Sequence, residues 1–152
     1  MNRIISTIAI AFAILTGASV HAENFYAGVF GGPNWSSHKH PGYLVGMDVG
    51  YRWCNGIRAE LEGSYRDEHE LAGLVNAYYD FNPYPVCNFC LAPFVGAGVG
   101  YAKHSFAWQL IAGLNYPLQD NIDLSLSYRF FNLACHENIH NHGLALGLNY
   151  HF

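Results

Sequence analysis

Charged residues are scarce in this sequence, in which Asp, Glu, Lys and Arg together make up 12% of 152 residues. Lysine and arginine number seven against eleven aspartates and glutamates, so the chain has no excess of positive charge. Proteins that bind nucleic acid present a basic face, because they neutralise backbone phosphates with Lys and Arg. We therefore expect no nucleic-acid partner.

Long apolar stretches are absent from residues 23–152. A transmembrane helix needs about 20 apolar residues, so none is expected there. The beginning of the chain differs, because Arg3 precedes a short apolar run from Ile8 to Leu15 and small residues follow up to Ala22. This is the layout of a secretory signal peptide, and the run is short for the alternative, a membrane anchor. We expect cleavage of residues 1–22, which leaves one domain, residues 23–152.

Aromatic residues and glycines are abundant instead, and apolar residues alternate with small or polar ones. In a β-strand, successive side chains point to opposite faces. Between Tyr43 and Trp53 every second residue is apolar, and Asp48 and Arg52 lie between them. The alternation recurs over residues 57–66, 106–116, 122–131 and 143–152, and more weakly over about 24–34, 72–81 and 92–102. Asn55-Gly56, between the strands 43–53 and 57–66, is a strong hairpin signal.

These segments make eight strands of about ten residues, each with one apolar face and with aromatics near its ends, which is typical of a transmembrane β-barrel. A soluble β-sandwich would also alternate, but it would rarely keep every arginine on one face while carrying so few charges. The sheet must close, because an open edge cannot be satisfied in hydrocarbon. We predict an all-β fold, an eight-stranded antiparallel transmembrane up-and-down β-barrel.

Charged residues in the strands fall on the predicted inner face. They are Asp48, Arg52, Arg58, Glu60, Glu62, Arg66, Asp80, Asp123 and Arg129. Buried charges are costly unless they are paired, and an eight-stranded barrel is only just wide enough for its side chains to fill. We expect an internal ion-pair network that leaves no continuous wide pore. The alternative is a proton or ion pathway.

Several segments, taken in order, resemble one known family. They are "NFYAGVFGG", "NAYYDF", "PFVGAGVGYAKHS", "FAWQLIAGLNYPLQDNIDLSLSYRFF" and "NHGLALGLNYHF". With the signal peptide, they make the chain similar to the outer-membrane β-barrel family, the opacity-type and OmpA-like surface proteins of Gram-negative bacteria. The resemblance covers most of residues 23–152.

The resemblance implies a barrel in the cell outer membrane, with both termini in the periplasm and four loops outside. The outer loops would be about Ser36–Gly42, Asp67–Glu70, Lys103–Ser105 and Asn132–Asn141, and the periplasmic connections Asn55-Gly56, residues 82–91 and "PLQDN". The last aromatic, Phe152, would be the signal read by the barrel assembly machinery. Since the chain stops at the last strand, we expect no peptidoglycan-binding domain after it. Outer-membrane lipid and lipopolysaccharide are the other expected partners, together with a host or environmental surface ligand that the sequence does not name.

Histidines gather at the predicted outer rim, which holds seven of the eight that follow residue 22. Imidazole and thiolate suit Zn²⁺, Cu²⁺ and Ni²⁺, so one hypothesis is a transition-metal site; no other cofactor is expected. The candidate ligands are His38, His40, His69, His104, Cys135, His136 and His140, with help from Asp67, Glu68 and Glu70. The alternative is that loops simply tolerate polar residues. The spacing matches no named zinc motif, and the resemblance implies a structural role for His142.

Four cysteines are present, in a compartment where disulfides persist. Cys54, Cys87 and Cys90 lie on the predicted periplasmic side, and Cys135 lies a barrel height away. We expect one disulfide within the first three and none that includes Cys135. The Cys87-x2-Cys90 spacing also resembles redox motifs, but no thioredoxin-like βαβ pattern surrounds it.

Some small outer-membrane barrels are hydrolases, and the lipid A deacylase family carries a His-x-Ser-Asn motif after a strand that ends in "YRF". Here Phe131 and Leu133 stand in those places, and no serine follows Ser127. Without a nucleophile beside a base, triad chemistry fails; Cys135 and His136, adjacent in a loop, are a poor pair. We predict a non-enzymatic protein with a structural or surface-interaction role, such as envelope integrity, surface antigen or adhesin. A small pore or transporter and a lipid A hydrolase are the alternatives.

Overall fold

A computed structural model describes residues 24–36, 41–66, 70–86, 89–102, 105–134 and 139–152. The predicted signal peptide lies outside these residues. Within the described ranges, no helix is long and apolar enough to cross a membrane. Nearly all of the described residues belong to strands.

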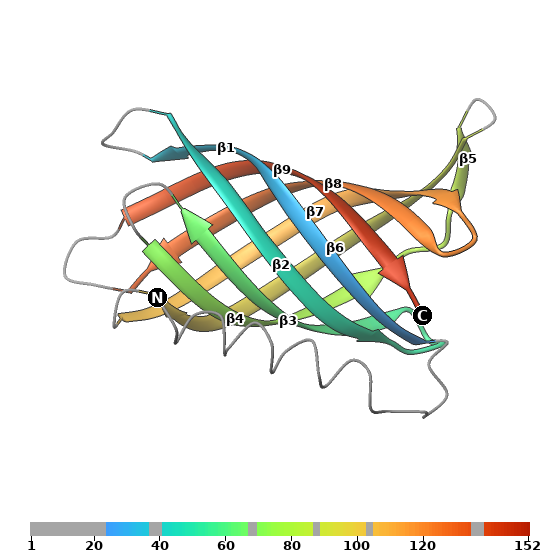
Figure 1. The fold of residues 1–152 in the computed structure, drawn as a ribbon, viewed down its shortest axis with the longest axis horizontal. Helices are drawn as coiled ribbons and strands as arrows, with labels where there is room; N and C mark the ends of the chain where they lie inside the picture. Colours follow the sequence, from blue (N-terminus) through green and yellow to red (C-terminus); the bar gives the residue numbers. More distant parts are fainter. Residues whose placement is uncertain (1–23, 37–40, 67–69, 87–88, 103–104, 135–138) are drawn as a thin grey trace, which may run out of the picture.

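Eight long strands form a closed antiparallel barrel, as the alternation predicted (Figure 1). Each strand pairs with its neighbours along the chain, and β1 also pairs with β9, which joins the first and last strands. The ring is complete because β4 pairs with β6. The strands are β1 (Phe25–Ser36), β2 (Gly42–Arg52), β3 (Ile57–Arg66), β4 (Glu70–Asp80), β6 (Phe89–Ala102), β7 (Ser105–Gln119), β8 (Ile122–Leu133) and β9 (Ile139–His151).

A ninth, short strand does not follow from the sequence pattern. It is β5 (Tyr84–Val86), which pairs with the first residues of β6. The two form a short two-stranded ribbon that projects beyond the barrel wall (Figure 1). The sequence predicts only a connection over residues 82–91, since three residues with a central Pro85 carry too little alternation to be recognised. Residues 53–56 do make the predicted tight hairpin, in which Gly56 has a φ of 84°.

Two connections are shorter than predicted. β7 continues through Pro117 to Gln119, with a register shift between them, so that only Asp120 and Asn121 remain of the expected "PLQDN" turn. β8 reaches Leu133 and β9 begins at Ile139, inside the loop expected over 132–141. Asn132 and Leu133 pair with His140 and Ile139. The hydrogen bonds between strands are made by backbone groups, so polar side chains do not prevent this pairing.

Side chains alternate between an apolar outer wall and a mostly polar interior. On the wall, Val29, Met47 and Leu146 are more than half exposed, as lipid-facing residues must be. The phase of β1, which alternation leaves open, puts Phe25 outward and Tyr26 inward, and Tyr26 is 1% exposed. Exposed aromatic residues flank the apolar band at both ends of the barrel. One end carries Trp35, Tyr43, Tyr101 and Phe106, and the other end carries Trp53, Tyr79, Phe81, Tyr150 and Phe152.

The inward glycines of β2 and β6 make room for large residues on the neighbouring strands. Gly96 pairs with Tyr78, and Gly50 pairs with Tyr26. A Cβ atom at either glycine would overlap the opposite tyrosine ring. The row of glycines in "PFVGAGVGYA" therefore provides space inside the barrel.

Candidate functional site: the polar interior of the barrel

Glu60 of β3 lies near the centre of the interior and is 5% exposed. Its Oε2 accepts a hydrogen bond from the Tyr26 hydroxyl at 2.6 Å, and its Oε1 accepts one from the Tyr78 hydroxyl at 2.9 Å. The Asn76 amide donates a further bond to Oε1 at 3.3 Å. Both tyrosines are absent from the predicted network. The alternation that places Asp80 inward also places Tyr78 inward, two residues earlier. Tyr26 lies two residues before Gly28, which pairs with Asp48, so the strand pairing places Tyr26 inward as well.

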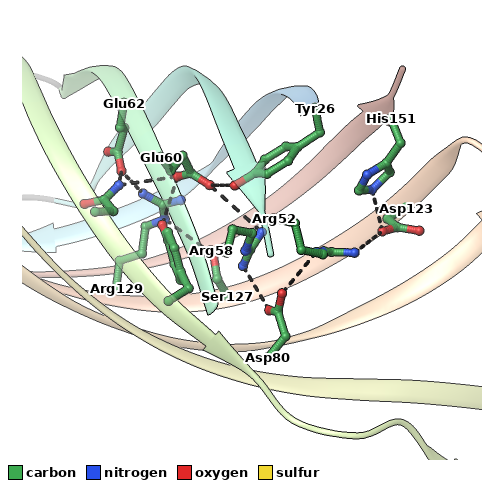
Figure 2. A network of polar contacts seen from close by, with 12 residues as sticks. Tyr26, Arg52, Arg58, Glu60, Glu62, Asp80, Asp123, Ser127, Arg129 and His151 are labelled. Atoms are coloured by element: carbon green, nitrogen blue, oxygen red, sulfur yellow. Dashed lines mark hydrogen bonds and ion pairs between the residues drawn. The ribbon is translucent and has the colours of Figure 1, made fainter. Parts of the chain in front are cut away.

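Glu62, two residues further along the same face, is 4% exposed. A single oxygen, Oε2, accepts from Arg129 Nη1 at 2.7 Å, from Gln109 Nε2 at 2.7 Å and from Asn76 Nδ2 at 2.8 Å. Gln109 Nε2 also donates to Asn76 Oδ1 at 2.8 Å. This cluster joins β3, β4, β7 and β8, so it ties opposite sides of the barrel together. Figure 2 shows its ion pair, between Glu62 and Arg129.

A second cluster lies toward the end of the barrel that carries the C-terminus (Figure 2). Asp80 forms ion pairs with two arginines: Arg58 Nη2 lies 3.3 Å from its Oδ1, and Arg52 Nε lies 3.2 Å from its Oδ2. Arg52 Nη1 is 3.9 Å from Asp123 Oδ2, and the same oxygen is 2.8 Å from His151 Nε2. The residues of this second cluster are partly exposed, with the exception of Arg58.

Three of the four arginines lie over aromatic rings. Arg58 lies 4.4 Å from the centroid of Tyr78, Arg129 lies 3.9 Å from that of Phe30, and Arg66 lies 3.8 Å from that of Phe131. A guanidinium is weakly hydrated and planar, so an aromatic face can replace part of its water. The interior is thus less purely polar than predicted.

Asp48 is the carboxylate with the fewest partners. It is 7% exposed, no ion pair reaches it from the described residues, and no hydrogen bond to its Oδ1 comes from them. A cavity of about 20 Å³ lies beside it, lined also by Asn115, Asn149 and Ser125. That volume holds about one water-sized particle.

The structure thus brings eight of the nine predicted network residues into direct polar contacts, with Asp48 as the ninth, beside the cavity. Arg66 Nη1 donates to Ser64 Oγ at 3.1 Å, and Arg129 Nε donates to Ser127 Oγ at 3.4 Å. The described side chains of the interior can hold charges in place and fill space. They include no serine or cysteine set beside a histidine, the arrangement that nucleophilic catalysis needs.

Of the candidate metal ligands, only His140 belongs to the described residues. Its Nδ1 accepts a hydrogen bond from Asn132 at 2.9 Å, and its ring stacks on Phe130 with centroids 5.7 Å apart. Among the described residues, no group of three His, Cys, Asp or Glu side chains could hold a metal ion. The remaining candidates fall outside the described ranges: His38, His40, His69, His104, Cys135 and His136. His142 is hydrogen-bonded to the Tyr128 hydroxyl on the outer wall.

Cys54 and Cys90 are exposed free thiols, so the described cysteines are not bonded to each other. Cys87 lies outside the described residues, and since both of its predicted partners are free thiols, the structure does not show the disulfide predicted within Cys54, Cys87 and Cys90. Phe152 joins the end of the chain to β1, because its N–H donates a hydrogen bond to the Phe25 carbonyl at 3.0 Å. Its ring packs against that of Tyr150, with the two centroids 5.3 Å apart. Its role as an assembly signal also stays a prediction.

Comparisons with known proteins agree with this architecture. The sequence model of a family described as "Outer membrane protein beta-barrel domain" matches residues 5–152. Outer membrane protein PagN of Salmonella typhimurium is 25% identical over 151 residues, covering 69% of this chain and 58% of that protein. The 25 kDa outer-membrane immunogenic protein of Brucella canis is 30% identical over 122 residues, covering 76% of this chain and 55% of that protein. The chain thus spans little more than half the length of these relatives. The crystal structure of Neisserial surface protein A superposes with a TM-score of 0.71 at 18% identity, covering 84% of this chain and 97% of that one.

Proposed function

The chain belongs to the outer-membrane β-barrel domain family, and we propose that it is a non-enzymatic, closed barrel that displays its four loops at the cell surface in a structural or surface-interaction role. Its relatives are outer-membrane proteins and its fold is that of an outer-membrane barrel, so the protein is located in the outer membrane. Lipid therefore surrounds the apolar wall.

The side chains that fill the middle of the barrel are the observation that supports a role other than transport. Side chains from β3, β4, β7 and β8 meet at Glu62 Oε2. Next to them, nearer the end of the barrel that carries the C-terminus, the interior is filled by Arg58, Tyr78 and Phe94. The central cavity of about 20 Å³ has room for one water molecule rather than a column of water. A porin needs a continuous aqueous path, which in barrels accompanies larger strand numbers.

Conductance in planar lipid bilayers tests the closed state. We expect the purified barrel to insert without sustained channel openings, whereas a porin reconstituted in the same way should conduct. Regular openings that scale with salt concentration would favour the small-pore alternative. Removing the central plug with Glu62→Ala and Arg129→Ala together should raise conductance, which shows that the assay detects an opened barrel.

The surface role rests on the loops and on a relative. The Brucella canis protein is described as an outer-membrane immunogenic protein, and this supports a surface role. We propose the same for this chain, through the loops at the barrel end opposite Phe25 and Phe152. Labelling Cys135 on intact cells with a membrane-impermeant maleimide tests the orientation, because Cys135 reacts only if the loop over about residues 132–141 faces outward. Cys54 and Cys90 should react only after lysis.

Lipid A hydrolysis is the enzymatic alternative, and it can be tested separately. The side chains at Phe131 and Leu133 are 2% and 3% exposed and apolar, so they offer no nucleophile or base. We expect mass spectrometry of lipid A to show no loss of acyl chains after overexpression. A mass decrease that matches one acyl chain would contradict a non-enzymatic role.

A further inference from the structure

Among the interior side chains that the structure describes, carboxylates outnumber guanidinium groups by one. Four arginines face five acidic residues there: Asp48, Glu60, Glu62, Asp80 and Asp123. An uncompensated charge is costly in a low-dielectric interior. His151 contacts Asp123 at the mouth of the barrel and does not line the central cavity.

The donors are distributed unevenly, and Asp48 receives the fewest. Glu60 and Glu62 together accept from two tyrosines, two amides and Arg129, whereas Asp80 takes Arg58 and Arg52. Among the described carboxylates, Asp48 therefore has the least compensated charge, with Arg58 and Arg129 as the cationic side chains that line its cavity.

Unpartnered oxygen atoms meet the cavity at this position. Asp48 Oδ1 and Asn115 Oδ1 are buried acceptors that no donor in the described part of the chain reaches, and both residues line the cavity. A Cβ atom at Gly28 would fall 2.5 Å from Asp48 Oδ1 and would overlap Asn149 Oδ1, so those two oxygens converge over a position that glycine leaves empty. The remaining polar lining consists of four oxygen-bearing side chains and two guanidinium groups: Glu60, Tyr78, Ser125, Ser127, Arg58 and Arg129.

We propose that this cavity binds a single monovalent metal cation of about the size of sodium, with Asp48 as its charged ligand. Carboxylate, amide and hydroxyl oxygens are the donors that hard cations prefer. The charge excess is one, so a divalent ion would overcompensate it next to Arg58 and Arg129. Those guanidinium groups do not occupy the site, because Arg129 is directed at Glu62 and Arg58 at Asp80.

Unfolding of the purified barrel in detergent micelles tests the proposal. The protein is folded from urea separately in sodium chloride and in choline chloride of equal ionic strength, so that an enclosed site is filled at equilibrium. Above the dissociation constant, each tenfold rise in sodium should raise the folding equilibrium constant about tenfold, because sodium binds only the folded state. Choline is too large for the cavity and should have no such effect.

Asp48→Asn should remove the sodium dependence and should be at least as stable as the natural barrel in choline chloride. Asp123→Asn is the matched control, since Asp123 already has Arg52 and His151 beside it, and it should keep the sodium dependence. Broadening of the ²³Na resonance by the natural barrel, absent with Asp48→Asn, gives an independent measurement that does not depend on stability.

Three results would overturn the proposal. The natural barrel could have the same stability in both salts, or Asp48→Asn could keep the sodium response. Stability could also depend on pH without depending on sodium, in which case a proton neutralises Asp48.

Discussion

At the scale of single residues, Glu62 shows how an outer-membrane barrel stabilises charge in its interior. Its Oε2 accepts three hydrogen bonds, and one of them comes from Arg129, which lies over the Phe30 ring. Removing one partner of a buried pair leaves the other charge uncompensated, and this is costlier than removing both. Glu62 and Arg129 therefore act as a unit.

Glu62→Gln should lower the free energy of unfolding by about 3–5 kcal/mol, because it leaves Arg129 buried without its counter-charge. Urea titration of the barrel in detergent micelles, followed by tryptophan fluorescence, measures the change. Combining it with Arg129→Met should restore much of the loss. A double variant no more stable than Glu62→Gln alone would mean that the two residues act independently.

At the scale of elements, the β4–β6 pair shows why strand sequences in this barrel alternate in size as well as in polarity. Every inward glycine of β6 faces a larger residue of β4: Leu74 opposite Gly100, Asn76 opposite Gly98 and Tyr78 opposite Gly96. The pair closes the ring, and it brings the Tyr78 hydroxyl to Glu60. The match of sizes thus links closure to the polar network.

Gly96→Val should destabilise the barrel by about 1–3 kcal/mol, because the added side chain overlaps the Tyr78 ring. The loss of β-sheet circular dichroism on heating measures the effect. Gly73→Val is the control, since a Cβ there meets no atom within 4 Å and the side chain faces outward. Tyr78→Ala should reduce the cost of Gly96→Val when the two are combined, and equal costs with and without Tyr78 would contradict the size argument.

The loops form the other elements on which a prediction rests. If the loop histidines bind a transition metal, calorimetric titration with Zn²⁺ should give saturable binding that weakens when His136 and His140 are replaced by Ala. His151→Ala, at the opposite end of the barrel, should leave the titration unchanged. Binding no tighter than millimolar would end the metal hypothesis.

At the scale of the whole molecule, the barrel separates two environments. The outside is an apolar wall between aromatic ends, and the inside holds charges that pair with one another. Lipid cannot hydrogen-bond to polar groups, so charges are tolerated on the inner face, and the ring must close because an open edge would leave backbone groups without partners. The short hairpin of β5 lies beyond this wall and is exempt from the constraint.

Position along the membrane normal should therefore decide the cost of a charge on the wall. Leu146→Arg, near the middle of β9, should cost about 2–4 kcal/mol in lipid vesicles, whereas Tyr150→Arg, near the aromatic end, should cost about 0–1 kcal/mol. Urea unfolding in vesicles of defined lipid composition measures both changes. Equal costs at the two positions would mean that the apolar band is not centred between the two aromatic ends of the barrel.

Periodicity alone predicted most of the fold, because lipid outside and a narrow lumen inside impose a period of two on every spanning strand. Strands, closure and the inward direction of the charged residues all follow from that period, and the family resemblance agreed with it. The extra strand β5 and the longer ends of β7, β8 and β9 were missed, since backbone ladders extend without requiring alternation.

Tertiary structure decided which residues meet. Glu62 and Arg129 are 67 residues apart, and Tyr26 and Glu60 are 34 apart, so no local pattern could pair them. The register between strands and the closure of the ring set these contacts, and among the described residues they also left Asp48 without an ion pair of its own. The period of a strand is a local property of the chain, whereas the partner of a buried charge depends on how the strands align around the barrel.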